Sequence, residues 1–229
     1  MLPGWFLTFE GPDGAGKTSQ VEWLRDRATD AGFDVLVTRE PGGTAVGEQI
    51  REVLLRTGGD GSLDPRTDAL LFNAARAQLV AQVIRPALAR GALVISTRFA
   101  DSTLAYQGYG AGVPLDELRA LEGVATGGLR PNLTILLDVP VEVGLARKSG
   151  GEVTRFEAEL DAAFHGRVRG GFLALAAADP ARFAVVDATR AESEVARAVV
   201  AAAAGVAGLE RLTAASRSEP APLGGRIPR

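Results

Sequence analysis

Five short segments rich in branched and aromatic side chains alternate with longer segments in which apolar residues repeat every three or four positions. The candidate strands are WFLTFE (5–10), FDVLVT (33–38), ALVIST (92–97), LTILLDV (133–139) and RFAVVDA (182–188). Because these segments are apolar almost throughout, they are typical of strands covered on both faces. Strands that alternate with helices predict an α/β fold around a five-stranded parallel sheet.

The helical pattern supplies the layers that would cover this sheet. The predicted helices are 17–31, 44–57, 66–89, 114–127, 157–178 and 192–209, with a shorter one at 141–147. Asp64 with Pro65, and Asp116 with Glu117 after Pro114, are typical signals for the start of a helix. Helices on both faces of a parallel sheet predict three layers.

Length and composition indicate one globular domain. A chain of 229 residues with 46% hydrophobic residues buries one large core, and we place the domain at residues 1–212. The last residues, TAASRSEPAPLGGRIPR (213–229), combine Pro, Gly, Ser and Arg without an apolar face. This composition predicts a disordered tail that carries no chemistry.

Charge and residue usage exclude several classes of function. The formal net charge is only −3, so no field of one sign indicates binding to nucleic acid or to an anionic membrane. The chain has no cysteine, which excludes disulfides, thiolate metal sites and cysteine nucleophiles. No apolar run approaches the roughly 20 residues of a membrane span, and no signal sequence is apparent, so we expect a cytoplasmic protein.

The stretch GPDGAGKT follows the first candidate strand and precedes the first candidate helix. Gly11, four further residues and then Gly16-Lys17-Thr18 match the phosphate-binding loop of nucleoside triphosphatases and kinases in full, in the required context. Its glycines let backbone amides converge on phosphate oxygens at the N-terminus of a helix. The predicted ATP-binding residues are Gly11, Pro12, Asp13, Gly14, Ala15, Gly16, Lys17 and Thr18. Lys17 would contact the outer phosphates, and the Thr18 hydroxyl would bind the Mg²⁺ that accompanies ATP.

This loop alone does not choose between nucleotide switches, motor ATPases and small-molecule kinases. The Asn-Lys-x-Asp motif of guanine recognition is absent, and the chain has only two lysines, Lys17 and Lys148. Arginines and aromatic residues at strand ends and in loop-like positions instead suit a second, anionic acceptor beside the triphosphate.

Four further stretches carry a resemblance to a known family. They are TREPGGTAVGEQIRE (38–52), DALLFNAARAQ (68–78), TRFADSTLAYQGYG (97–110) and LRPNLTILLDVPVEVGLAR (129–147). Together with the phosphate loop, they resemble the thymidylate kinases, which phosphorylate dTMP with ATP, from about residue 5 to about residue 190. The resemblance implies a P-loop kinase fold with a short lid, a Mg²⁺-ATP donor, a dTMP acceptor and a homodimer.

The resemblance also implies roles for the acceptor residues. Arg51 and Arg98 correspond to the arginines that hold the dTMP phosphate, and Arg39 and Glu40 lie in the same motif. Phe72 would stack on thymine, and Arg76 would bind its carbonyl edge. Thr103 and Gln107 would lie near the base, and Tyr106 beside the sugar. Asp13 resembles the carboxylate that binds the 3′-hydroxyl group.

Between the predicted helices at 141–147 and 157–178, KSGGEVT resembles the lid that closes over ATP, at about residues 147–156. The subgroup with glycine at the position of Gly14 supplies its transition-state cation from this lid. Arg147, Lys148 and Arg155 are the candidates, and the residues alone do not choose among them. With Lys17, Arg98 and Asp13, they complete the predicted catalytic set.

The chain departs from the family in two places. Thr97-Arg98-Phe99 stands where the family usually has Asp-Arg-Tyr, and Thr154 stands where an Asp commonly precedes the lid arginine. Because the carboxylate that Thr97 replaces is thought to organise magnesium and the phosphates, we expect an active but slow enzyme. Two alternatives stay open: a kinase of another nucleoside monophosphate or small metabolite, and a nucleotide-binding protein with weakened catalysis.

Overall fold

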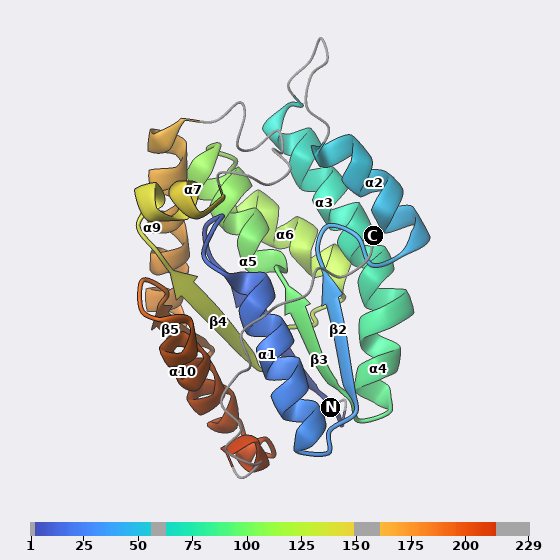
Figure 1. Ribbon diagram of the computed structural model, residues 1–229. Helices are drawn as coiled ribbons and strands as arrows, with labels where there is room; N and C mark the ends of the chain where they lie inside the picture. The colour runs from blue at the N-terminus through green and yellow to red at the C-terminus, as the bar shows by residue number, and fades with distance from the viewer. Residues whose placement is uncertain (1–2, 56–62, 149–160, 214–229) are drawn as a thin grey trace.

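The computed structural model describes residues 3–55, 63–148 and 161–213. It confirms the predicted five-stranded parallel sheet, with the strands in the order β2-β3-β1-β4-β5 (Figure 1). The strands are β1 (Trp5–Glu10), β2 (Val35–Arg39), β3 (Leu93–Thr97), β4 (Leu133–Asp138) and β5 (Phe183–Asp187). Each observed strand lies within the segment predicted for it, except that β2 extends one residue further, to Arg39.

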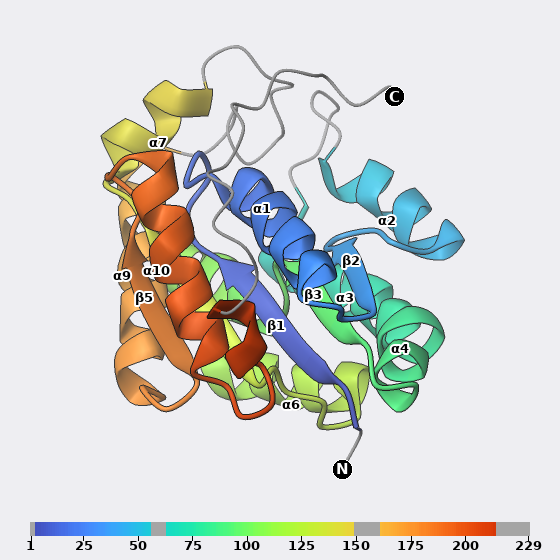
Figure 2. The same ribbon diagram turned by 60° about the horizontal axis from the view of Figure 1, so that its bottom comes forward.

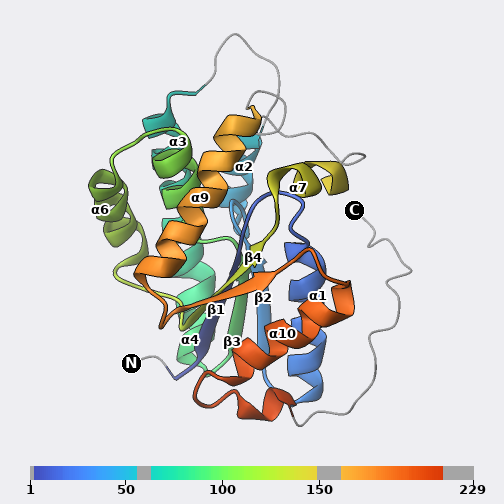
Figure 3. The same ribbon diagram turned by 90° about the vertical axis from the view of Figure 1, so that its left-hand side faces the viewer.

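Two layers of helices cover the sheet. The described helices are α1 (Lys17–Asp30), α2 (Ala45–Leu55), α3 (Pro65–Leu79), α4 (Arg85–Ala89), α5 (Ala100–Thr103), α6 (Leu115–Thr126), α7 (Val141–Lys148), α9 (Ala162–Ala178) and α10 (Glu192–Ala204). In Figure 3, the sheet lies between α1 and α10 on one side and α3, α6 and α9 on the other. Figure 2 shows that the N-terminus lies at the end of the sheet away from α2 and α7.

Strand β1 shows why both faces need cover. Leu7 and Phe9 are fully buried in the cluster that packs under α1 and α10, whereas Phe6 is buried in the cluster on the other face. Successive side chains of a strand point to opposite faces, so the residues of this continuous apolar run are buried in two hydrophobic clusters, one on each face of the sheet. In open α/β sheets of this kind, ligands bind at the carboxyl ends of the strands.

The helix predicted at 66–89 is continuous but not uniform. It runs through α3, a π-helical turn η1 (Val80–Ile84) and α4. Pro86 lies at the start of α4 and has no N–H group to donate to the preceding turn. A π turn before it lets the helix continue past the proline. At its other end, Asp64 caps α3 by accepting a hydrogen bond from the Arg66 amide at 2.8 Å.

The segment after β3 contains a helix that is not among the predicted ones. Residues 100–110 form a continuous helix, with α5 followed by the π-helical turn η2 (Leu104–Gly110). Its buried side chains, among them Leu104, Ala105 and Tyr106, pack against α9. Tertiary packing therefore stabilises a helix in spite of the glycines at 108 and 110.

Two predicted segments lie outside the described residues. Of the predicted lid at 147–156, only Arg147 and Lys148 are described, at the end of α7. Of the predicted tail at 213–229, only Thr213 is described, at the end of the 3₁₀ turn η3 (Glu210–Thr213). Within the three described ranges, no helix is both long enough and apolar enough to cross a membrane.

Candidate active site

The phosphate loop connects β1 to α1 and depends on its glycines. Gly11, Gly14 and Gly16 have φ values of 137°, 75° and 84°, which L side chains rarely adopt. A Cβ atom on Gly14 would also lie 1.9 Å from the carbonyl oxygen of Gly144 in α7. The sequence therefore needs glycine here for its backbone conformation and for close packing.

Lys17 begins α1 and folds back over this loop. Its Nζ donates hydrogen bonds to the carbonyl oxygens of Gly11 at 2.9 Å and Pro12 at 2.7 Å. These contacts hold the ammonium group above the loop, at the N-terminus of α1. The helix dipole and the first amides of α1 add to its charge, so this end of α1 attracts phosphate.

A pocket of about 590 Å³ lies over the loop. It is lined by Asp13, Gly14, Ala15, Gly16, Lys17, Thr18, Ser19, Gln20, Arg147, Ala188, Arg190, Glu192 and Val195. Arg147 donates to the carbonyl oxygen of Ala188 at 2.8 Å, so it ties α7 to the segment after β5. Of the predicted lid cations, the structure brings Arg147 to this pocket, Lys148 ends α7, and Arg155 lies outside the described residues.

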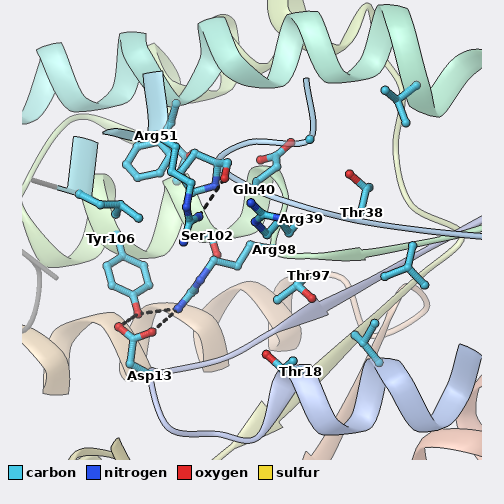
Figure 4. A pocket seen from close by; sticks show the side chains of 18 of the residues that line it. Asp13, Thr18, Thr38, Arg39, Glu40, Arg51, Thr97, Arg98, Ser102 and Tyr106 are labelled. Atoms are coloured by element: carbon cyan, nitrogen blue, oxygen red, sulfur yellow. Dashed lines mark hydrogen bonds and ion pairs between the residues drawn. The ribbon is translucent and has the colours of Figure 1, made fainter. Parts of the chain in front are cut away.

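A second pocket, of about 540 Å³, adjoins the first (Figure 4). Asp13 and Thr18 line both pockets, so the two cavities share a boundary. The predicted acceptor residues that line the second pocket are Asp13, Arg39, Glu40, Arg51, Phe72, Arg98, Thr103, Tyr106 and Gln107. Residues far apart in the sequence thus meet at the carboxyl end of the sheet.

Arg98 lies where the two pockets meet. Its Nη2 donates to Asp13 Oδ1 at 2.6 Å and to the Tyr106 hydroxyl at 3.2 Å, and that hydroxyl donates to Asp13 Oδ2 at 3.0 Å. Burial lowers the pKa of Arg98, but Tyr106, Asp13 and Glu10 outweigh it, so the net pKa is raised and the guanidinium stays charged. Burial raises the pKa of Tyr106, so its hydroxyl stays protonated and available as a donor.

The other two pocket arginines are held differently. Arg51, on α2, donates to the carbonyl oxygen of Pro41 at 2.9 Å, and Figure 4 shows its side chain and that of Arg98 extending into the pocket. Arg39, at the end of β2, pairs with Glu48 at 3.0 Å, and its side chain is 54% exposed. Arg51 and Arg98 are therefore the better placed to converge on one anion.

Arg76 does not line this pocket, as a residue predicted to bind thymine would, but is buried behind residues that do. Its side chain is 1% exposed and pairs with Glu40, 4% exposed, at 2.7 Å. Arg76 also donates to Asn73 Oδ1 at 3.1 Å and to Thr103 Oγ1 at 3.0 Å. Burial raises the pKa of Glu40, and Arg76 opposes that rise. Arg76 therefore fixes Glu40 and Thr103, which line the pocket together with Phe72 and Gln107.

Thr97 ends β3 and lines the second pocket beside Arg98. It pairs in register with Phe9 of β1 and Arg39 of β2, so it lies at the carboxyl end of the sheet between these two strands. The structure therefore places a neutral hydroxyl among the charged side chains of this pocket.

Two residues that the motifs do not single out hold Arg98 in place. Ser102 donates to Glu10 Oε2 at 2.6 Å and accepts from Arg98 Nη1 at 3.0 Å. Glu10 also accepts from the Phe99 amide at 2.7 Å. The sequence does contain a signal for Glu10, since it is a carboxylate at the end of an otherwise apolar strand. A carboxylate is rarely buried without partners, so its place in the strand indicates that other polar groups contact it.

Comparisons with known proteins point to one family. The thymidylate kinase family profile matches residues 9–199. The chain is 56% identical to a thymidylate kinase of Thermomicrobium roseum over 197 residues, which cover 85% of this chain and 92% of that protein. It is 51% identical to a thymidylate kinase of Deinococcus radiodurans over 196 residues, or 85% and 94% of the two chains.

A solved structure is also similar. The crystal structure of thymidylate kinase from Ehrlichia chaffeensis matches with a TM-score of 0.70 and 33% sequence identity, over 87% of this chain and 98% of that one. The residues matched by the family profile include all those that line the two pockets. This protein belongs to the thymidylate kinase family.

Proposed function

We propose that this protein transfers the γ-phosphoryl group of ATP to the 5′-phosphate of dTMP, giving dTDP and ADP on the route to dTTP. The observation that carries the proposal is the pair of adjoining pockets, one over the phosphate loop and one lined by arginines, with Asp13 and Thr18 on both. Two anionic nucleotides bound in this way would meet phosphate to phosphate. Membership of the thymidylate kinase family supports the same reaction.

The donor pocket would bind and orient the triphosphate. The amides of the loop and of the first turn of α1 would receive phosphate oxygens, and Lys17 would exchange its contacts with Gly11 and Pro12 for the outer phosphates. Lys17 is buried, so water screens its attraction for the phosphates less than it would at the surface.

The acceptor pocket would place the nucleophile. Arg51 and Arg98 would hold the dTMP phosphate with paired N–H groups, and Arg39 would add charge at the rim. A phosphate oxygen is already a nucleophile, so the transfer needs position and charge neutralisation more than a general base. Lys17 on the donor side and Arg98 on the acceptor side would offset the charge of the two phosphates as they approach.

The same pocket would select the nucleoside. Phe72 would stack on thymine, with Thr103 and Gln107 at the base edge, and Arg76 would act on that edge from behind Glu40 and Thr103. Asp13 would accept a hydrogen bond from the 3′-hydroxyl, and Tyr106 would fill the space beside C2′ of the sugar.

An ATP-dependent kinase implies a divalent metal, and the residues present fit Mg²⁺. The Thr18 hydroxyl lies on the boundary of both pockets, next to the site proposed for the phosphates. Among the described residues, no three His, Cys, Asp or Glu side chains form a metal-binding group, so phosphate oxygens and water would complete the coordination, as is usual for Mg²⁺. When bound, the ion would neutralise negative charge on the phosphates.

Three further features belong to the proposal. A lid cation, Arg147, Lys148 or Arg155, would neutralise the transferring phosphoryl group, and Arg147 already lines the donor pocket. A homodimer would form through the helices, and the exposed apolar side chains of Val53, Leu70 and Val124 support it. Free nucleotide substrates fit a cytoplasmic location.

A coupled assay of ADP release, with and without dTMP, tests the proposal. We expect release to depend on dTMP, and dTMP to be preferred over dUMP, UMP and AMP. Arg51→Ala and Arg98→Ala should raise the KM for dTMP by about tenfold or more each, the usual range for hydrogen bonds between charged groups. Arg90→Ala, at an exposed pair with Asp34, serves as the control. A preference for AMP, or ATP binding without transfer, would contradict the proposal.

A further inference from the structure

The backbone of Arg98 is in an unusual conformation. Among the described residues, Arg98 is the only one other than glycine with a positive φ, at 68°. This left-handed conformation is unfavourable for an L residue with a Cβ atom, so it persists only where the surroundings hold it. It also sets the direction in which the guanidinium leaves β3.

Three hydrogen bonds hold this conformation. The Arg98 amide donates to the carbonyl oxygen of Phe9 at 2.9 Å, and Ser96 Oγ donates to the carbonyl oxygen of Arg98 at 2.8 Å. The next amide, that of Phe99, donates to Glu10 Oε1 at 2.7 Å. Only the last of these bonds has a carboxyl oxygen as its acceptor, and when ionised that acceptor makes the stronger bond.

The second oxygen of Glu10 positions the guanidinium group of Arg98 through Ser102. Ser102 has one hydroxyl proton, and it donates that proton to Glu10 Oε2 at 2.6 Å. The Ser102 oxygen therefore presents a lone pair to Arg98 Nη1, which donates to it at 3.0 Å. Glu10 thus fixes both the backbone after Arg98 and the hydroxyl that receives one arm of its side chain.

Glu10 does this without lining either pocket. It is fully buried, whereas Ser102 and Arg98 line the acceptor pocket. A buried carboxylate is unfavourable for folding, and here the nearby Asp101 adds a like charge. An apolar residue at the end of β1 would avoid this penalty, so the carboxylate needs an explanation other than stability.

We propose that Glu10 is the positioning residue of Arg98: its two oxygens hold the left-handed backbone and orient Ser102, so that the guanidinium is aimed at the acceptor phosphate before dTMP binds. The inference rests on the proposed function, because it assigns Arg98 to that phosphate. Glu10 acts through Arg98 and does not contact substrate.

Steady-state kinetics with dTMP and ATP varied independently test the inference. Glu10→Gln keeps the size of the side chain and removes its charge. We expect the KM for dTMP to rise by about tenfold, since hydrogen bonds to a charged group are weakened, while the KM for ATP stays within about twofold. Ser102→Ala should shift the KM for dTMP in the same direction, and Ser102→Thr, which keeps the hydroxyl, should restore it.

A double-mutant cycle separates positioning from a general effect on folding. If Glu10 acts through Arg98, Glu10→Gln should produce no further rise in the KM for dTMP in the Arg98→Ala background. The matched control is Asp138→Asn, which removes the half-buried carboxylate at the end of β4, paired with Arg169 at 2.8 Å, and should leave the KM for dTMP within about twofold. A crystal structure of Glu10→Gln should show Arg98 turned from its present direction.

The possible failures are distinguishable. A parent protein that phosphorylates no dTMP refutes the proposed function. A parent that does so, with a Glu10→Gln variant whose KM for dTMP is unchanged or whose two KM values rise equally, refutes only the inference. Additive effects of Glu10→Gln and Arg98→Ala would refute it as well.

Discussion

Arg98 and Asp13 form an ion pair of 2.6 Å across the boundary between the two pockets, and each side chain is only 17% exposed. Tyr106 closes the cluster through its hydroxyl group. The arginine that we propose for the acceptor phosphate is therefore paired with the carboxylate that we propose for the acceptor sugar. Binding of dTMP would replace this pair with two contacts to one ligand.

The ring and the hydroxyl of Tyr106 should have separable effects. If the ring excludes a 2′-hydroxyl group, Tyr106→Ala should reduce the preference for dTMP over its ribose counterpart, whereas Tyr106→Phe should keep that preference. Tyr106→Phe should still raise the KM for dTMP, because Asp13 and Arg98 lose a partner. Values of kcat/KM for the two nucleotides measure both effects, and equal selectivity in the three proteins would contradict this role.

Thr97→Asp should raise kcat. The substitution restores a carboxylate beside Arg98 at the end of β3, where the family usually has one, and would help organise the metal and the phosphates. Steady-state rates at saturating ATP and dTMP check it. Thr97→Asn, of similar size and without charge, is the control, and an unchanged or lower kcat in Thr97→Asp would count against the expectation.

Glu10 should make stability depend on pH. Burial and then Asp101 raise its pKa from 4.5 to about 7, against the opposing effects of Arg98, Ser102 and the Phe99 amide. Because the folded state holds the proton more tightly, the contribution of Glu10 is greatest below pH 4.5 and is lost as the pH rises through 7. Relative to Glu10→Gln, the parent should lose up to about 3 kcal/mol over this range, at about 1.4 kcal/mol per pKa unit.

Urea unfolding of both proteins at several pH values between about 4.5 and 8 measures this difference. Groups elsewhere titrate alike in the two proteins and cancel in the comparison. A difference in the free energy of unfolding that stays constant, or that grows in favour of the parent with rising pH, would show that folding does not raise the pKa of Glu10.

The buried pair of Arg76 and Glu40 should matter more for stability than an exposed pair. Arg76→Ala leaves Glu40 buried without its partner, and the expected loss in the free energy of unfolding is about 3–5 kcal/mol. Arg90→Ala removes an exposed pair with Asp34 and should cost less than about 1 kcal/mol. Chemical denaturation compares them, and similar losses would contradict the difference in burial.

Local patterns in the sequence predict much of this fold. The strands follow from largely apolar segments of six or seven residues, and the phosphate loop from eight consecutive positions, because each signal lies within one segment. The helix at 100–110 does not follow in this way. It packs against α9, more than fifty residues further along, and also against α6 and α3, and these distant contacts favour it over a glycine-containing loop.

The sequence predicts which residues form the site, but not which hydrogen bonds and ion pairs they make with one another. The resemblance brings the acceptor residues together, and nearly all of them line one pocket. It does not reveal that Arg76 lies behind that pocket, paired with Glu40, or that Arg98 pairs with Asp13, 85 positions away. Such pairings depend on burial and on competition among several charges, which no short motif records.

The contact between Gly14 and Gly144 has a mechanical consequence. With no side chain on either residue, the main chain of the phosphate loop rests directly on the main chain of α7, and a Cβ atom on Gly144 would lie 2.4 Å from the Asp13 carbonyl oxygen. No soft side chain lies between them to absorb a displacement. A tilt of α7, the helix that precedes the predicted lid, would therefore displace Asp13 directly. A movement of α7 when ATP binds would in this way change the position of a residue that we propose for dTMP.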